Sequence, residues 1–154
     1  MTIWLLQFCL GLIVANAGEW AMHRYLLHGL GKQRDSIWAY HLHEHHIIAK
    51  KLNMLDPGYQ SSPKRWNSQA KELLVLVSIL AFHIPFFWWI NGYAWGLNIA
   101  VVSYYLLHKK AHKDIDWAKH YLPWHYQHHI GNPNSNWCVS YPLFDYLMKT
   151  HNRN

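Results

Sequence analysis

Two long stretches of the chain contain no charged side chain. Residues 1–18 form the first stretch, and residues 73–107 form the second, which divides at Asn91-Gly92 into two apolar runs. A helix rises about 1.5 Å per residue, so a run of about 18 residues reaches roughly 27 Å, close to the thickness of the hydrocarbon core of a bilayer. The pattern therefore predicts membrane-length helices over residues 1–18 and 73–90.

A third helix is expected after the Asn91-Gly92 turn. The run 93–107 is shorter, but a helix can continue through His108 and Lys109, whose side chains can reach the membrane interface. Half of the chain is hydrophobic (51%), ten residues are Trp and only 14% are charged, which is unusual for a soluble domain. We therefore expect an all-α integral membrane protein with about three transmembrane helices, in a single domain over residues 1–154. The alternative is a soluble protein that buries the same residues as a helical hairpin.

The positive charges fall into two blocks. All 14 Lys and Arg residues lie between Arg24 and Lys71 or beyond Leu107. The positive-inside rule places both blocks in the cytoplasm, and three spans then put the start of the chain and the Asn91-Gly92 turn on the outside. This bias and attraction to anionic lipid headgroups explain the formal net charge of +6. We expect no nucleic-acid partner, because the basic residues form no continuous stripe and no binding motif is present.

Four short windows of the chain are rich in histidine. They are residues 23–28, 41–46, 108–112 and 125–129, and they hold 11 of the 14 histidines. Neutral imidazole is the commonest side-chain metal ligand, and residues three or four apart share one face of a helix. So many histidines exceed the three or four ligands that a single tetrahedral zinc site uses, which predicts a two-metal centre. The expected topology brings all four windows to the same cytoplasmic membrane surface, as a histidine-rich helical cap.

The order of these windows resembles a known family. The spacings H-x4-H, H-x3-HH, H-x3-H and H-x2-HH, the Glu19-Trp20 pair before them and the closing NWCVSYPLFDYL are similar to the fatty acid hydroxylase superfamily of integral-membrane, non-haem dimetal oxygenases. Its members include fatty acid 2-hydroxylases, sterol desaturases and short bacterial carotene hydroxylases. The resemblance implies that the metal ligands are ten histidines: His23, His28, His41, His45, His46, His108, His112, His125, His128 and His129.

The second window departs from the usual H-x2-HH spacing of the family. Leu42 stands where that spacing requires a histidine, so either His41, one residue further away, or His43 must serve. We favour His41, which lies one helical turn before His45.

Several polar residues near the windows could orient these ligands. Glu19 lies four residues before His23 and could orient that imidazole, although an interfacial charge is an equal alternative. His120, close to the last window, is a second candidate. Weaker candidates of the same kind are Asp114, Asp116 and Asp145.

The resemblance implies a chemistry as well as a site. It implies O2-dependent hydroxylation or desaturation of a membrane lipid chain at a di-iron centre, with zinc possible in the purified protein. Imidazole ligands suit iron, and an open coordination position lets O2 bind. An external ferredoxin or cytochrome reductase system is implied as electron donor, because the chain has no Rossmann fingerprint and no c-type haem motif. Chain length favours a carotenoid ring hydroxylase, whereas residues 136–147 look more like fatty acid or sterol hydroxylases, and we expect an acyl or related lipid.

A non-catalytic, histidine-rich membrane protein that binds or transports zinc is the alternative of another class. A transporter places its ligands near the bilayer midplane, along a pathway. Here only His83 is expected at that depth. We expect a structural role for it, in satisfying a backbone carbonyl that Pro85 leaves free.

Overall fold

The computed structural model describes residues 1–63 and 65–152, and this part of the chain contains helices and no strand. The helical elements in chain order are α1 (Thr2–Ala21), η1 (Met22–Leu27), η2 (Leu30–Lys32), η3 (His41–His46), α2 (Ile47–Lys51), η4 (Pro57–Tyr59), α3 (Ser68–His83), α4 (Phe86–Trp89), α5 (Asn91–Ala111), α6 (Ile115–Tyr121), α7 (Pro123–Ile130) and α8 (Leu143–Leu147). The all-α prediction is confirmed for the described residues.

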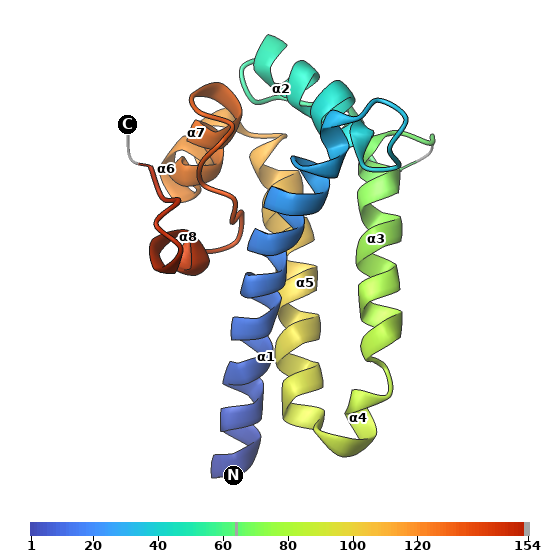
Figure 1. Ribbon diagram of the computed structural model, residues 1–154, viewed down its shortest axis with the longest axis vertical. Coiled ribbons are helices and arrows are strands. Elements are labelled where there is room, and N and C mark those ends of the chain that lie inside the picture. The colour runs from blue at the N-terminus through green and yellow to red at the C-terminus, as the bar shows by residue number, and fades with distance from the viewer. Residues whose placement is uncertain (64, 153–154) are drawn as a thin grey trace.

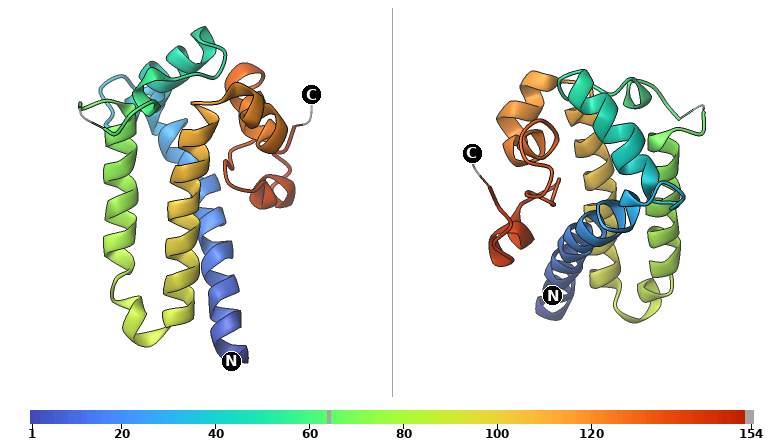
Figure 2. Two further views of the ribbon diagram at one scale, coloured as in Figure 1. Left: turned by 180° about the vertical axis from the view of Figure 1, so that it is seen from behind. Right: turned by 45° about the horizontal axis from the view of Figure 1, so that its top comes forward.

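The long helices form a stem, and the short elements form a cap at one end of it (Figure 1). We define the stem as α1, α3, α4 and α5, and the cap as η1 to η4 with α2, α6 and α7. The chain begins at the far end of the stem, and α4 turns the chain back there between α3 and α5. The two further views show the same division, with α8 lying beside the cap end of the stem (Figure 2).

Helices α1 and α5 pack against each other through glycines. A Cβ atom added at Gly11 would clash with the carbonyl oxygen of Tyr93, and one added at Gly96 would clash with that of Phe8. Small residues at a crossing let two backbones approach closely, which is how helices commonly associate in a bilayer. The pair α1 and α5 therefore forms the tightly packed side of the stem.

Proline decides where the second predicted helix ends. The prediction was one helix over residues 73–90, but α3 ends at His83 and a separate turn, α4, follows Pro85. Proline has no backbone N–H and cannot continue the hydrogen-bond ladder. The carbonyl of Ala81, which loses this partner, accepts a hydrogen bond from the N–H of Ile84 at 3.2 Å. His83 does not fill that role, because its Nδ1 contacts the carbonyl of Ile79 at 2.8 Å.

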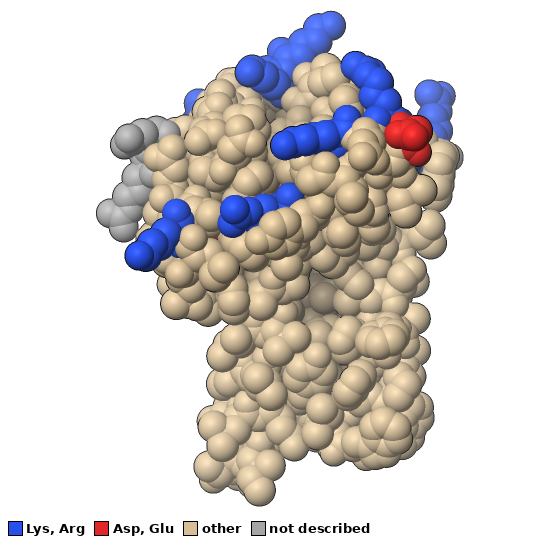
Figure 3. Space-filling model, in the orientation of Figure 1, with Lys and Arg blue, Asp and Glu red and all other residues tan. Residues whose placement is uncertain are grey.

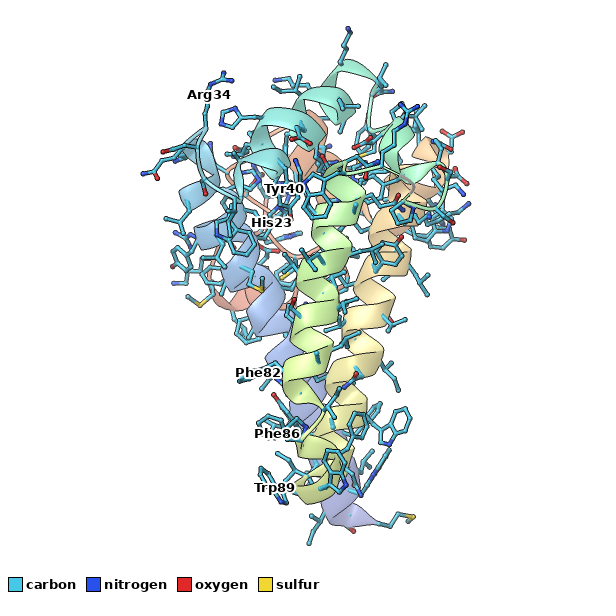
Figure 4. The ribbon with its side chains drawn as sticks, turned by 90° about the vertical axis from the view of Figure 1, so that its right-hand side faces the viewer. His23, Arg34, Tyr40, Phe82, Phe86 and Trp89 are labelled. Carbon is cyan, nitrogen blue, oxygen red and sulfur yellow. The ribbon has the colours of Figure 1, made fainter. Side chains whose placement is uncertain are left out.

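The stem exposes large apolar side chains. Trp88 and Trp89 are 75% and 78% exposed, and Phe82 is 73% exposed; Figure 4 shows Phe82 and Trp89 in the half of the stem away from the cap. Among the described residues, one helical stretch is long and apolar enough to cross a membrane, at Thr2–Lys32. The first predicted span is thus supported by length and composition, while the spans over 73–90 and 93–107 stay predictions.

Candidate metal centre

Nine buried histidines converge in the cap and form two groups. Cluster A contains His23, His28, His41, His46 and His128. Cluster B contains His45, His108, His112 and His129. Within each cluster, one nitrogen from every ring lies within 4.8 Å of the others. Side chains from segments up to 105 residues apart in cluster A and 84 residues apart in cluster B thus meet in two ligand-like groups.

The four sequence windows are divided between the two clusters. The first window supplies cluster A alone and the third supplies cluster B alone, whereas the second and fourth contribute to both. His125, the tenth predicted ligand, lies beside cluster B, with its Nε2 atom 3.3 Å from the Nε2 atom of His112. The rings of His46 and His129 lie 4.2 Å apart between their centroids and bring the two clusters into contact.

Two π-helical turns account for the unusual spacing of the first two windows. Elements η1 and η3 are π-helices, in which each N–H bonds to the carbonyl five residues earlier. In η1 the N–H of His28 bonds to the carbonyl of His23 at 2.9 Å. In η3, His41 and His46 are also five residues apart, and their Nε2 atoms lie 3.1 Å from each other. The extra residue in the second window therefore fits a π-helical turn in place of an α-helical one.

The structure separates the two candidates in the second window. His41 is 4% exposed and belongs to cluster A. His43 is partly exposed and its Nε2 atom contacts the carbonyl oxygen of Lys32 at 3.2 Å, outside both clusters.

Backbone carbonyls and carboxylates fix the orientation of five rings. The Nδ1 atoms of His23, His128 and His112 contact the carbonyl oxygens of Trp137, Ser135 and Met54 at 2.5, 2.7 and 2.6 Å, respectively. The Nδ1 atoms of His45 and His108 contact the carboxylates of Asp56 and Glu72 at 2.8 and 2.7 Å, respectively. Because these oxygens can only accept, each Nδ1 carries the ring proton and each Nε2 presents a lone pair.

The Nε2 lone pairs within each cluster face one another. Their separations show whether a metal ion would fit between them. The Nε2 atoms of His108 and His112 lie 3.1 Å apart, although neither has a proton to donate. The other close Nε2 pairs within the clusters are separated by 2.9 to 3.2 Å. Two nitrogens bound to one ion at about 2.1 Å are about 3.0 Å apart at a right angle and about 3.4 Å apart at the tetrahedral angle. The histidines of each cluster therefore fit the binding of one metal ion.

The histidine rings of the clusters resist protonation. Burial, and next the positive charge that His46 would carry, lower the pKa of His41 well below its ordinary value of 6.5. Burial likewise lowers the pKa of His129 well below 6.5, and it lowers that of His128 to about 4. These rings are neutral at physiological pH, which is the form that binds a metal ion.

The carbonyls that orient cluster A come from a tail segment, residues 135–141, which a buried carboxylate holds in place. Asp145 is fully buried and accepts hydrogen bonds from the N–H groups of Trp137 and Cys138, both at 2.8 Å. Asn136, between Ser135 and Trp137, has a positive φ of 57°, a conformation that asparagine tolerates better than most residues. This turn directs the two neighbouring carbonyls towards His128 and His23.

Glu19 fixes the same tail segment and does not contact His23. Its carboxylate accepts hydrogen bonds from the N–H of Val139 and from the N–H and hydroxyl of Ser140, the latter two at 2.8 and 2.5 Å. The contact with His23, one of the two alternatives for Glu19, is absent from the described hydrogen bonds, because the carbonyl of Trp137 occupies the Nδ1 of that ring.

Of the other residues predicted to orient ligands, Asp145 acts through the tail segment, whereas His120, Asp114 and Asp116 contact no histidine of either cluster among the described contacts. His120 is exposed and packs against the ring of Tyr121. Asp114 caps α6 by accepting the N–H of Trp117 at 3.1 Å, and Asp116 is exposed. The sequence pattern did not indicate Asp56 and Glu72, whose carboxylates contact ligand-type rings among the described residues. Their spacing from His45 and His108 carries no local signal, since one lies in a Pro-Gly turn and the other begins the apolar part of α3.

A mostly apolar cavity of about 560 Å³ runs from the metal centre into the stem. Its walls come from α1, α3, α5 and the tail segment, and Figure 3 shows a hollow in the surface where the stem meets the cap. His23 of cluster A lines it together with Tyr40, and Figure 4 shows both residues at the base of the cap. Glu72 and His83 line it as well; eleven residues along a helix correspond to about 16 Å, a length that a lipid chain can occupy.

Comparison with known proteins gives one match. A family model described as fatty acid hydroxylase matches residues 8–150. No curated protein and no solved structure matches the chain. The matched region includes every histidine of clusters A and B and the segments that orient them.

Proposed function

Because the chain belongs to the fatty acid hydroxylase family, we propose that it is a histidine-ligated di-iron oxygenase that hydroxylates or desaturates a membrane lipid. The family assignment and the buried histidine clusters fit a metal-dependent oxygenase. The observation that carries the proposal is the apolar cavity, because it places a space for a lipid chain directly against His23 of cluster A.

The ten histidines predicted from the sequence would hold the two ions. Cluster A and cluster B would each take one ion, with His125 available beside cluster B. When bound, iron would activate dioxygen for attack on an unactivated C–H bond. In hydroxylation, one oxygen atom of O2 replaces the C–H bond by C–OH and the other leaves as water. This balance consumes two electrons and two protons, which an external ferredoxin or cytochrome reductase system would supply.

The residues of the chain would position the lipid and exclude water. The cavity walls from α1, α3 and α5 are apolar, so they favour an acyl chain over a polar substrate. Glu72 borders the cavity and also accepts the Nδ1–H of His108, so it joins the wall of the cavity to the ligand set. A dry cavity also protects a reactive centre from side reactions with water.

The exposed surface supports a membrane location with the cap in the cytoplasm. Lys and Arg residues lie over the cap in Figure 3, and the stem shows none on this face. By the positive-inside rule, the cap and both clusters would face the cytoplasm, while the stem would lie in the bilayer. The cavity lies in the upper stem and would thus receive lipid from the bilayer itself.

Oxygen uptake by the purified protein tests the proposal. We expect about two irons per chain and O2 consumption that requires both a reductant and lipid. The zinc-binding alternative instead predicts zinc in the clusters, with no uptake in an iron-reconstituted sample. Gathering of both clusters at one end of the molecule, away from the middle of the stem, favours the enzyme, because a transporter requires ligands along a pathway.

A further inference from the structure

The two clusters differ in the groups that hold their rings. Among the described hydrogen bonds, the Nδ1 atoms in cluster A that have a partner contact backbone carbonyls, those of Trp137 and Ser135. In cluster B, His45 contacts the carboxylate of Asp56, and His108 contacts that of Glu72. Backbone carbonyls therefore make the direct contacts to the rings of cluster A, with the Asp145 carboxylate one step further out, whereas two carboxylates and the carbonyl of Met54 contact the rings of cluster B.

Both carboxylates are buried, and each oxygen of both accepts a hydrogen bond. Asp56 is 2% exposed, and its second oxygen accepts the N–H of Gly58 at 2.8 Å. Glu72 is 6% exposed, and its second oxygen accepts the hydroxyl of Tyr59 at 2.5 Å. Lys71, the cation next to Glu72 in sequence, pairs instead with Glu44. Lys71 therefore does not neutralise the charge of Glu72.

We propose that Asp56 and Glu72 make cluster B the tighter of the two metal sites, so that cluster B binds a divalent cation before cluster A does. This inference deepens the proposed function and rests on its two-metal centre. A carboxylate that accepts the Nδ1–H of an imidazole raises the basicity of the ring as a ligand. The negative charge of the carboxylate also attracts the cation through an interior of low dielectric constant.

Ligand number does not set the order. Cluster A contains five histidines, and cluster B contains four, with His125 beside it as a fifth candidate ligand. Losing an outer partner of a metal-bound histidine typically costs about 10- to 100-fold in metal affinity, and cluster B has two carboxylate partners of this kind. Because the numbers of candidate ligands are similar, the negative charge of these two carboxylates sets the order. Asp56 and Glu72 act as positioning residues, because each reaches the ion only through a histidine.

A titration with Co²⁺ tests this inference. Metal-free full-length protein in detergent is titrated with Co²⁺ against a competing chelator, and the absorption of the bound ion is recorded. We expect two binding constants that differ by at least about tenfold, as one carboxylate partner would produce. His28→Ala should remove the weaker ion and His112→Ala the tighter ion, because these residues belong to clusters A and B, respectively.

Charge-neutral variants identify the cause. Asp56→Asn and Glu72→Gln keep an oxygen that can accept the Nδ1–H but remove the negative charge, so each should weaken the tighter ion by about 10-fold or more and leave the other within about twofold. Glu44→Gln is the matched control. It removes a carboxylate from η3 that pairs with Lys71 at 2.6 Å and touches neither cluster among the described contacts, so it should change neither constant.

Equal binding constants in the wild-type protein would overturn the inference, as would loss of the tighter ion in His28→Ala. It would also be overturned if both neutral variants kept a native circular dichroism spectrum and bound both ions normally. The experiments distinguish failure of this inference from failure of the proposed function. A protein with unequal sites and no reductant-dependent O2 uptake would contradict the function alone, and an active enzyme with equal sites would contradict this inference alone.

Discussion

The carboxylate of Asp145 accepts a hydrogen bond from the backbone N–H of Trp137 at 2.8 Å, deep inside the protein. The carbonyl of the same Trp137 orients His23 in cluster A. Asp145 is therefore the buried anchor that connects the folding of the tail segment to the geometry of the metal centre.

Replacing this anchor should destabilise the protein. Asp145→Ala leaves the N–H groups of Trp137 and Cys138 without an acceptor, and each buried unsatisfied donor costs about 1–3 kcal/mol. We expect the free energy of unfolding to fall by about 2–6 kcal/mol, as measured by denaturation in detergent. Asp145→Asn keeps one acceptor oxygen and should lose less. An Asp145→Ala variant of native stability would contradict the anchoring role.

The second histidine window offers a direct comparison of neighbouring residues. His41→Ala should reduce metal content by about one ion per chain and abolish product formation, because its ring belongs to cluster A. His43→Ala is the control and should retain both ions, since His43 contacts the carbonyl of Lys32 instead. Elemental analysis of the purified variants measures both outcomes. Loss of metal in His43→Ala with retention in His41→Ala would reverse the assignment.

The buried histidines should make the metal-free protein sensitive to acid. Burial lowers the pKa of His41 and His129 well below 6.5 and that of His128 to about 4. The unfolded chain binds protons below pH 6.5 that the folded chain cannot bind, so stability is complete above this pH and is lost as the pH falls towards 4 and below. Each such histidine contributes a slope of up to about 1.4 kcal/mol per pH unit.

Denaturation of the metal-free protein at pH 7.5 and at pH 5 measures this slope. His129→Ala should reduce it, because one of the buried rings is then absent. Stability that stays constant or rises on acidification would show that the rings already carry protons in the folded state.

Blocking the cavity should separate substrate binding from metal binding. Ala100 lines the cavity on α5, and Ala100→Trp should reduce product formation by about 10- to 100-fold, because the lipid chain can no longer align with the centre. Metal content should not change. Val102→Trp is the control on the same helix, since Val102 is 48% exposed and does not line the cavity. Equal product from the Ala100 variant and the control would rule out this cavity as the lipid site.

The sequence predicted the helical class and the convergence of the histidine windows, because apolar run length and histidine spacing are both local signals. It did not predict how the windows divide between clusters. On one face of an α-helix, residues three or four apart lie together. Elements η1 and η3 are π-helices instead, and they bring together residues five apart, such as His41 and His46. The prediction of one helix over residues 73–90 was wrong because Pro85, which breaks it, was treated as part of the apolar run.

The carboxylates illustrate a second limit. Glu19 was a candidate for orienting His23 because four residues separate them, with an interfacial charge as the alternative, but in the structure it binds the tail segment. Asp56 and Glu72 contact rings that are 11 and 36 residues away. Such partners are set by how the cap folds over α3 and α5, and no local spacing records that arrangement.

The most direct measurement of the central claim is lipid mass spectrometry of cells that produce the wild-type chain or the variant with both His108→Ala and His112→Ala. These two residues supply half of cluster B. We expect that the wild-type chain alone gives a lipid that has gained one oxygen atom or lost two hydrogen atoms, and that the variant gives none and binds less metal. Identical lipid profiles in cells with the wild-type chain and in cells without it, despite full loading with iron and a working electron donor, would contradict it.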